Sequence, residues 1–170
     1  MRPPHPLPKR IPPQPGQESV WDYPRPPRVE ATNERIVIEF GGVVLVDTNN
    51  AVRVLETSHP PVYYLPIDAF LSGSLEPARG QSFCEFKGMA GYLTVVGPKG
   101  RRAESAAWFY ANPTHGYEAL KDHVAIYPSA MDRCLVNGEI VQSQEGDFYG
   151  GWITSKVVGP FKGAPGTLGW

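Results

Sequence analysis

The chain has 170 residues, 41% of them hydrophobic, and a formal net charge of −1 at pH 7. This length and apolar content predict a single domain with an ordinary core. The near-neutral charge argues against nucleic-acid and membrane-surface binders, which need a concentrated positive field, so we expect neither as a partner.

The two cysteines, Cys84 and Cys134, lie far apart and belong to no CxxC pair. They therefore predict neither a disulfide framework nor a cysteine-based zinc site, and they favour two buried thiols in a reducing compartment. We expect no metal and no cofactor. Prolines interrupt every apolar run near the N-terminus, so the sequence predicts no signal peptide and a cytoplasmic location.

Ten of the 19 prolines precede Val29, and this density predicts an extended proline-rich arm over residues 1–28. Within the arm, residues 20–23 (Val-Trp-Asp-Tyr) carry two large aromatic rings that a free linker would not need. We expect this part of the arm to lie against the body of the domain.

From Arg35 onward the pattern is that of short strands, without a long amphipathic helix. Gly41-Gly42 and Asn137-Gly138 each lie between two apolar runs, as the turns of tight hairpins do. Residues 66–71 and 117–121 predict one or two short helical turns. The sequence thus predicts an all-β domain over residues 29–145, a sandwich, barrel or folded sheet, followed by a glycine- and aromatic-rich extension over 146–170.

Three ionisable residues are the candidates for catalysis, although no familiar catalytic or nucleotide-binding motif is present. His59 is held between Ser58 and two prolines, with Glu56 near in sequence, which suits either a base or a loop histidine bonded to backbone. Glu85 and Lys87 flank Phe86 and would share one face of a strand. On a dry concave face they could form an acid/base pair, and on an ordinary surface they would form an ion pair.

Aromatic side chains supply the candidates for ligand binding. Trp108 and Tyr110 alternate with Phe109, so they would share one strand face. Asp147 is the only carboxylate among the aromatic residues of the extension, where it would either have a raised pKa or cap a turn. The candidate ligand-binding residues are Tyr64, Trp108, Tyr110, Asp147, Tyr149 and Trp152.

Four stretches resemble the signature segments of the domain-of-unknown-function family 427. They are residues 61–68 (PVYYLPID), 84–88 (CEFKG), 107–113 (AWFYANP) and 124–128 (VAIYP). The resemblance covers residues 29–141 and implies a compact all-β domain of the β-tent (Mss4-like) kind, or antiparallel sheets arranged as in a barrel. Relatives with that fold hold zinc through two cysteine pairs, which this chain lacks.

The same family sometimes carries a nucleotidyltransferase label. That chemistry expects a Gly-Ser followed by paired metal-binding aspartates, and Gly73-Ser74 is not followed by a D-x-D. Our first hypothesis is a β domain that binds an unidentified small molecule in an aromatic-lined pocket, with or without catalysis. The alternatives are a non-catalytic interaction or homo-oligomerisation module, as a homodimer for example, and, third, a nucleotidyltransferase-like enzyme.

Overall fold

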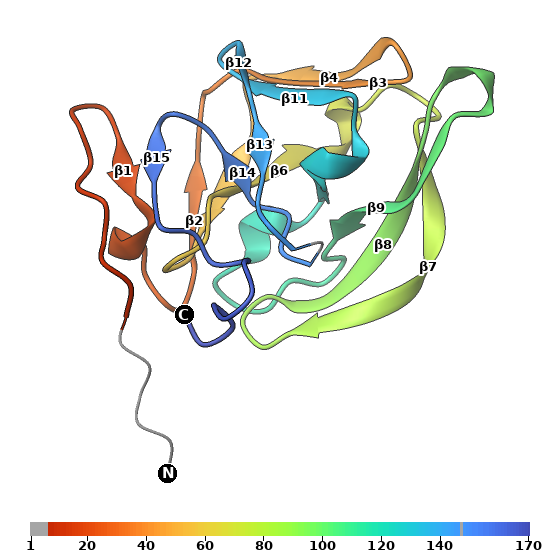
Figure 1. Ribbon diagram of the computed structural model, residues 1–170. Helices are drawn as coiled ribbons and strands as arrows, with labels where there is room; N and C mark the ends of the chain where they lie inside the picture. Colours follow the sequence, from red (N-terminus) through yellow and green to blue (C-terminus); the bar gives the residue numbers. More distant parts are fainter. Residues whose placement is uncertain (1–6, 147) are drawn as a thin grey trace.

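The computed structural model describes residues 7–146 and 148–170 and confirms the predicted all-β class (Figure 1). Within these residues the only helical elements are single turns of 3-10 helix, and none has the length and apolarity to cross a bilayer. The turns are η1 (Val20–Asp22), η2 (Ile67–Ala69), η3 (Pro98–Gly100), η4 (Glu118–Leu120) and η5 (Pro128–Ala130).

Two of these turns, η2 and η4, lie where the sequence predicts helical turns, and the other three exceed the prediction. Pro98 and Pro128 begin η3 and η5. A proline at the first helical position has the right φ and lacks only an N–H that would have no partner there. The proline-rich composition thus produces more single turns than the apolar pattern reveals.

The larger sheet has seven strands, and all its neighbouring pairs are antiparallel. Its edges are β2 and β7, which do not pair, so the described sheet stays open instead of closing into a barrel. In spatial order its strands are β2 (Arg28–Ala31), β5 (Val52–Leu55), β6 (Val62–Pro66), β10 (His123–Ile126), β9 (Arg102–Phe109), β8 (Gly88–Val96) and β7 (Leu75–Cys84).

The second sheet has four strands, and two short pairs complete the described structure. The four-stranded sheet runs β12 (Glu139–Ile140), β11 (Arg133–Val136), β3 (Ile36–Phe40) and β4 (Val43–Thr48). β13 (Gln142–Ser143) pairs antiparallel with β14 (Trp152–Ile153). The one parallel pair among the described strands joins β1 (Glu18–Ser19) to β15 (Val157–Val158).

Both predicted glycine hairpins form. Gly41 and Gly42 have φ of 62° and 80° between β3 and β4, and Asn137 and Gly138 have φ of 47° and 83° between β11 and β12. Positive φ at both central residues is the type I′ geometry that matches the twist of the flanking strands. These two turns fix the register of the four-stranded sheet.

Residues 52–57 alternate apolar and polar side chains as a half-buried strand would, but the strand formed there, β5, is not half-buried. The strand ends at Leu55, and all four of its residues are buried, including Arg53. Arg53 donates to Glu18 at 2.9 Å and to Glu30 at 2.6 Å. The ion pairs with these two carboxylates hold the two terminal nitrogens of a guanidinium that the alternating pattern would place in water, while its Nε is buried without a partner among the described residues.

Alternate residues of the seven-stranded sheet belong to two different cores. On β6, Tyr63 and Leu65 pack in a core facing the four-stranded sheet, whereas Tyr64 packs in a second core on the opposite face. On β9, Ala107 joins the first core and Trp108 the second. Because side chains alternate along a strand, one sheet supports both layers.

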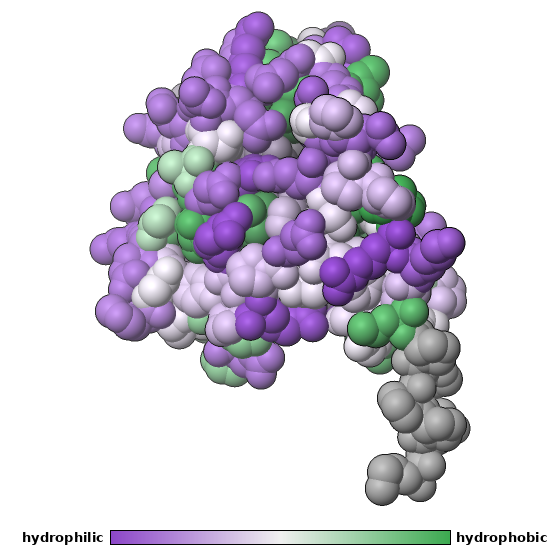
Figure 2. Space-filling model, turned by 90° about the vertical axis from the view of Figure 1, so that its left-hand side faces the viewer, coloured by the Kyte–Doolittle hydropathy of each residue, from purple (hydrophilic) through white to green (hydrophobic). Residues whose placement is uncertain are grey.

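The N-terminal arm and the C-terminal segment lie together along one side of the domain. As predicted, Val20, Trp21 and Tyr23 are buried, and they form a third core with Leu55 and Val157. The Trp21 indole N–H donates to the Pro160 carbonyl at 2.9 Å. Figure 2, which views the molecule from the side of β1 and β15, shows a mainly hydrophilic surface with small, scattered apolar groups.

Candidate functional site

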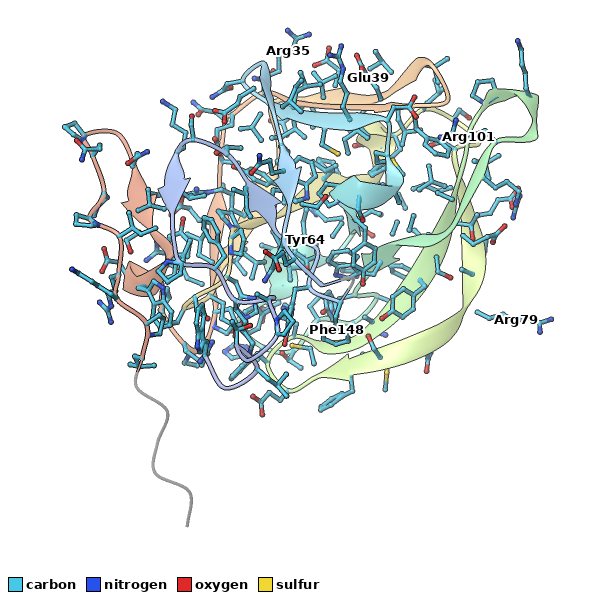
Figure 3. All side chains as sticks on the ribbon, viewed as in Figure 1. Arg35, Glu39, Tyr64, Arg79, Arg101 and Phe148 are labelled. Atoms are coloured by element: carbon cyan, nitrogen blue, oxygen red, sulfur yellow. The ribbon has the colours of Figure 1, made fainter. Side chains whose placement is uncertain are left out.

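A cavity of about 240 Å³ adjoins the second core, where the seven-stranded sheet meets the segment that follows β13. Side chains of β6, β7, β8 and β9 form one wall, and Phe148, Tyr149 and Lys162 close the other. Figure 3 shows Tyr64, from the sheet, near Phe148, from the C-terminal segment. Two parts of the chain that are far apart in sequence therefore enclose one space.

Trp108 lies at the centre of the aromatic wall. Its ring centroid is 4.5 Å from that of Tyr127 and 6.2 Å from that of Tyr64, the latter at an interplanar angle of 85°. The Trp108 indole N–H donates to the Tyr64 hydroxyl oxygen at 3.1 Å, so its polar edge is satisfied inside the protein. Such edge and tilted packing fixes the rings and leaves aromatic surface toward the cavity.

Three of the cavity phenols, those of Tyr64, Tyr110 and Tyr127, are uncharged near neutral pH. Burial is the main cause that raises the pKa of Tyr64, and it also raises the pKa of Tyr110 and Tyr127. These hydroxyl groups can donate and accept hydrogen bonds, but they add no negative charge to the site.

His59 is a neutral part of the wall. It is 7% exposed, and burial, followed by the charges of Lys162, Arg25 and Lys87, lowers the pKa of His59 to about 3. Its Nε2 is 3.5 Å from Glu56 Oε2, a contact that an uncharged ring makes through Nε2–H. With both nitrogens facing protein groups, the ring has no free basic nitrogen near neutral pH. This geometry does not favour the general-base role considered from the sequence.

Gln144 fixes the orientation of His59 and the path of the chain around it. Its Nε2 amide donates to His59 Nδ1 at 3.4 Å and to the Lys162 carbonyl at 2.7 Å. Its Oε1 accepts from the Gly151 N–H at 3.0 Å. Because Nδ1 accepts a bond here, the imidazole proton is on Nε2.

Two lysines, Lys87 and Lys162, bring ammonium groups to the cavity wall. Lys87 Nζ lies 5.9 Å from the centre of the Tyr110 ring, and Lys162 Nζ lies 5.3 Å from that of Tyr149. Cation–π contacts of this kind hold a charge against an apolar surface without neutralising it. Among the described residues, neither ammonium group pairs with a side-chain carboxylate, although Lys162 Nζ also donates to the Trp170 backbone oxygen at 3.5 Å.

Two glycines let the C-terminal segment approach the wall closely. A Cβ at Gly150 would lie 2.5 Å from Trp108 Cη2, and a Cβ at Gly151 would lie 2.5 Å from Gln144 Oε1. Any other residue at either position would displace the segment or the side chain beneath it. These two glycines are thus explained by close packing against the Trp108 ring and against the Gln144 side chain that supports the wall.

A family model described as a domain of unknown function (DUF427) matches residues 28–137. The chain belongs to the DUF427 family. A comparison with curated proteins finds no match. The short name of the family model, NTP_transf_9, refers to nucleotidyl transfer, but its description assigns no function.

The DUF427 match supplies only part of the cavity. Tyr64, Lys87 and Trp108 lie within it, whereas Tyr149 and Lys162 lie beyond its end at residue 137. The boundaries expected from the sequence, 29–145 for the domain and 146–170 for the extension, stay predictions. The segment after the match is nonetheless built into the fold, because Trp152 lies in the first core.

Most of the candidate site residues of this DUF427 protein meet at the cavity. Those that line it are His59, Tyr64, Lys87, Trp108, Tyr110 and Tyr149. Asp147 lies outside the described residues. Glu85 and Trp152 do not line the cavity, each for a different reason.

The expectation that Glu85 and Lys87 share a strand face is wrong. β7 ends at Cys84 and β8 begins at Gly88, so residues 85–87 form the turn of a hairpin. Gly88 has a φ of 106°, which suits the reversal of the chain. As a result Glu85 is exposed, and Lys87 is directed to the cavity without it.

Trp152 packs on the other side of the seven-stranded sheet. It is 1% exposed, its ring centroid is 5.0 Å from that of Tyr63, and its indole N–H donates to the Ile126 carbonyl at 3.4 Å. Tyr63 and Tyr64 point to opposite faces of β6, so the ring that contacts Tyr63 cannot also reach the Tyr64 cavity.

Sequence reasoning missed several lining or supporting residues, among them Tyr127, Cys84, Gln144 and Lys162. Cys84 is half-buried at the cavity, contrary to the expectation of two buried thiols, whereas Cys134 is buried and burial raises its pKa to about 12. Lys162 reaches the site because its backbone N–H donates to the Ser58 carbonyl at 2.9 Å. No local pattern could show that long-range contact, and only the phenylalanine-lysine-glycine run at residues 161–163 marks the position.

The described residues bring together no group of three His, Cys, Asp or Glu side chains that could hold a metal ion. Gly73 and Ser74, the only residues matching the nucleotidyltransferase pattern, do not line the cavity. Ser74 is 2% exposed, just before β7. The cavity and the Gly-Ser pair are therefore separate features of the fold.

Proposed function

We propose that this DUF427 protein binds a small molecule in the cavity beside Trp108. The observation that carries the proposal is the composition of the wall, where fixed aromatic rings surround a few polar groups, namely His59, Lys87 and Lys162. Ligand sites in proteins have this combination of apolar surface and sparse, oriented polar groups. The volume of about 240 Å³ falls below the range of about 300–1,000 Å³ of drug-sized pockets, which favours a compact ligand.

Binding is favoured over catalysis in this proposal because neither candidate base is available in the cavity, and Glu56, the one carboxylate among the described lining residues, is paired with Arg25. The pKa of His59 is lowered to about 3, and Glu85, the other candidate base, is exposed on the β7–β8 turn. Cytoplasmic residence remains part of the proposal, and the half-buried free thiol of Cys84 suits a reducing compartment.

The test is ligand-observed NMR with a library of one- and two-ring compounds, followed by protein-observed spectra of each hit. Binding in the cavity shifts the indole N–H resonance of Trp108 and leaves that of Trp152, in the opposite core, unchanged. Hits that shift Trp152 and spare Trp108, or a library without hits, would count against the proposal.

A matched pair of variants gives an independent check. Cys84→Phe adds a ring to the cavity wall, whereas Arg79→Phe adds the same ring on the same strand, where Arg79 points away from the body (Figure 3). We expect C84F to abolish binding of the hits and R79F to retain it. Equal binding by both variants would place the ligand elsewhere.

One observation favours the alternative of a homodimer. Phe83 and Met89 are 71% and 48% exposed and lie opposite each other on the β7–β8 hairpin. Extension of the sheet is not favoured, because Pro77 and the bulge between Pro77 and Gln81 interrupt the edge. The two protomers would thus contact each other through the side chains of Phe83 and Met89. Sedimentation of the wild type and of Phe83→Ser tests it, since a dimer should dissociate in the variant.

A nucleotidyltransferase-like activity is the third candidate and rests on the family's short name alone. Magnesium-dependent binding of nucleoside triphosphates, measured by calorimetry, would support it, and absence of binding would remove it.

A further inference from the structure

We propose that the cavity selects organic anions, with the acidic group attracted by Lys87 and Lys162 and a flat ring placed against Trp108 and Tyr127. This inference rests on the proposed function and adds the chemical class of the ligand. It depends on the charge balance of the wall, on the neutral state of the other polar groups and on the shape of the aromatic surface.

Among the described residues, the charged side chains at the cavity leave an excess of positive charge. Among the described lining residues the only carboxylate is that of Glu56, which Arg25 pairs at 3.2 Å through Nη2. The ammonium groups of Lys87 and Lys162 contact aromatic rings, and no described side-chain carboxylate pairs with either. Lys162 Nζ also donates to the Trp170 backbone oxygen at 3.5 Å. A recess with charges of one sign and apolar walls concentrates the field, so it attracts a ligand of the opposite sign.

The pKa of His59, a residue of the cavity wall, responds to this positive field. After burial, the causes that lower its pKa are the charges of Lys162, Arg25 and Lys87, all cations. A positive potential that disfavours an imidazolium favours a carboxylate or phosphate for the same reason. The buried phenols do not offset it, since burial raises the pKa of Tyr64 and Tyr110 and keeps both uncharged.

The aromatic surface sets the shape of the remainder of the ligand. Trp108 and Tyr127 are held 4.5 Å apart and tilted by 45°, and Gly150 packs over the edge of Trp108. Planar rings gain more from such rigid aromatic walls than flexible chains do, because less conformational freedom is lost on binding. The cavity volume suits one or two rings.

The experiment compares probes that share one ring and differ in charge: benzoate, phenyl phosphate, benzamide and benzylamine. Dissociation constants are measured by NMR titration, with the Trp108 indole N–H as the reporter of cavity binding. We expect at least one of the two anions to bind about tenfold or more tightly than benzamide, as for hydrogen bonds to charged groups, and benzylamine to bind most weakly. Inorganic phosphate and cyclohexanecarboxylate separate the contribution of the acid from that of the flat ring.

Lysine variants connect the selectivity to the proposed residues. Lys87→Met and Lys162→Met should each weaken binding of the anion by about tenfold and leave benzamide unaffected. Lys121→Met removes the same charge from an exposed position that does not line the cavity, and it should bind as the wild type does.

The outcomes separate the two proposals. Benzamide or benzylamine binding at Trp108 as tightly as the anions would overturn the anion selectivity and leave small-molecule binding intact. Loss of anion affinity in K121M equal to that in K87M and K162M would also overturn it, because the effect would then be one of overall charge. If neither a probe nor a library compound shifts the Trp108 indole N–H resonance, the proposed function itself is overturned.

Discussion

The Gln144 side chain donates to Nδ1 of His59 at 3.4 Å across 85 residues of sequence. The same amide also holds the backbone at Gly151 and Lys162. One buried side chain therefore sets the tautomer of the histidine and ties the C-terminal segment to the loop after β5. The cavity wall depends on this connection, because Tyr149 packs on His59 at 4.8 Å between ring centroids.

We expect Gln144→Ala to destabilise the protein by about 2–4 kcal/mol, because it leaves the Gly151 N–H and the Lys162 carbonyl without their partner in a buried site. Urea denaturation measures the change. Gln142→Ala, two residues earlier on the exposed face of β13, is the matched control and should change the free energy of unfolding by less than about 0.5 kcal/mol. Similar losses in both variants would contradict the role assigned to Gln144.

The lowered pKa of His59 predicts that acid destabilises the fold. Above pH 6.5, the pKa of the histidine in the unfolded chain, the ring is neutral in both states. As the pH falls from 6.5 towards about 3, the unfolded chain binds a proton at His59 and the folded chain does not. Stability is therefore lost across this window, by up to about 5 kcal/mol from this group. His59→Gln should show a flatter dependence of unfolding free energy on pH. Equal slopes would show that His59 is protonated in the fold.

Gly150→Ala tests the contact between the extension and Trp108. The added Cβ would lie 2.5 Å from Cη2 of that ring, and the positive φ of 71° adds strain. Gly100→Ala is the control, since its φ is 74° and the position is open. We expect a loss of about 1 kcal/mol in G100A from strain alone, and about 2–4 kcal/mol in G150A together with a changed Trp108 fluorescence. Equal losses of stability in G150A and G100A would mean that the segment moves away from the added Cβ without further destabilisation.

Trp152→Ala tests whether the segment beyond the family match is part of the fold. The ring is 1% exposed in the first core, so its removal should cost about 3–5 kcal/mol. Trp170→Ala, at a half-buried ring that packs on Trp21 at 5.6 Å, should cost less. Melting temperatures of the two variants provide the comparison. A small effect of W152A would show that the segment after residue 137 is dispensable for the core.

Local patterns predicted the parts of the fold that local chemistry determines. The two hairpin turns follow from residues that adopt positive φ, and the opposite orientations of Trp108 and Phe109 follow from strand alternation. The same alternation predicted that Trp108 and Tyr110 share a face, and both line the cavity.

The parts that could not be predicted depend on contacts between distant segments. Arg53 is buried because Glu18 and Glu30 come from other strands, and Gln144 matters because it meets His59. Glu85 was misplaced for a local reason: a strand of alternating residues and a tight three-residue turn have similar compositions when the turn contains a phenylalanine. The sequence does not show that Trp152 lies away from the other candidate ligand-binding residues, because the adjacent residues Tyr63 and Tyr64 offer aromatic partners on both faces of β6.

The wall of the cavity is divided between the matched domain and the segment that follows it. The strands of the matched domain supply the rigid floor, with Trp108 and Lys87, while Tyr149 and Lys162 close the space from a part of the chain that carries few strand hydrogen bonds. Substitutions at Tyr149 and Lys162 can therefore change the shape and charge of the cavity while the sheet keeps its register.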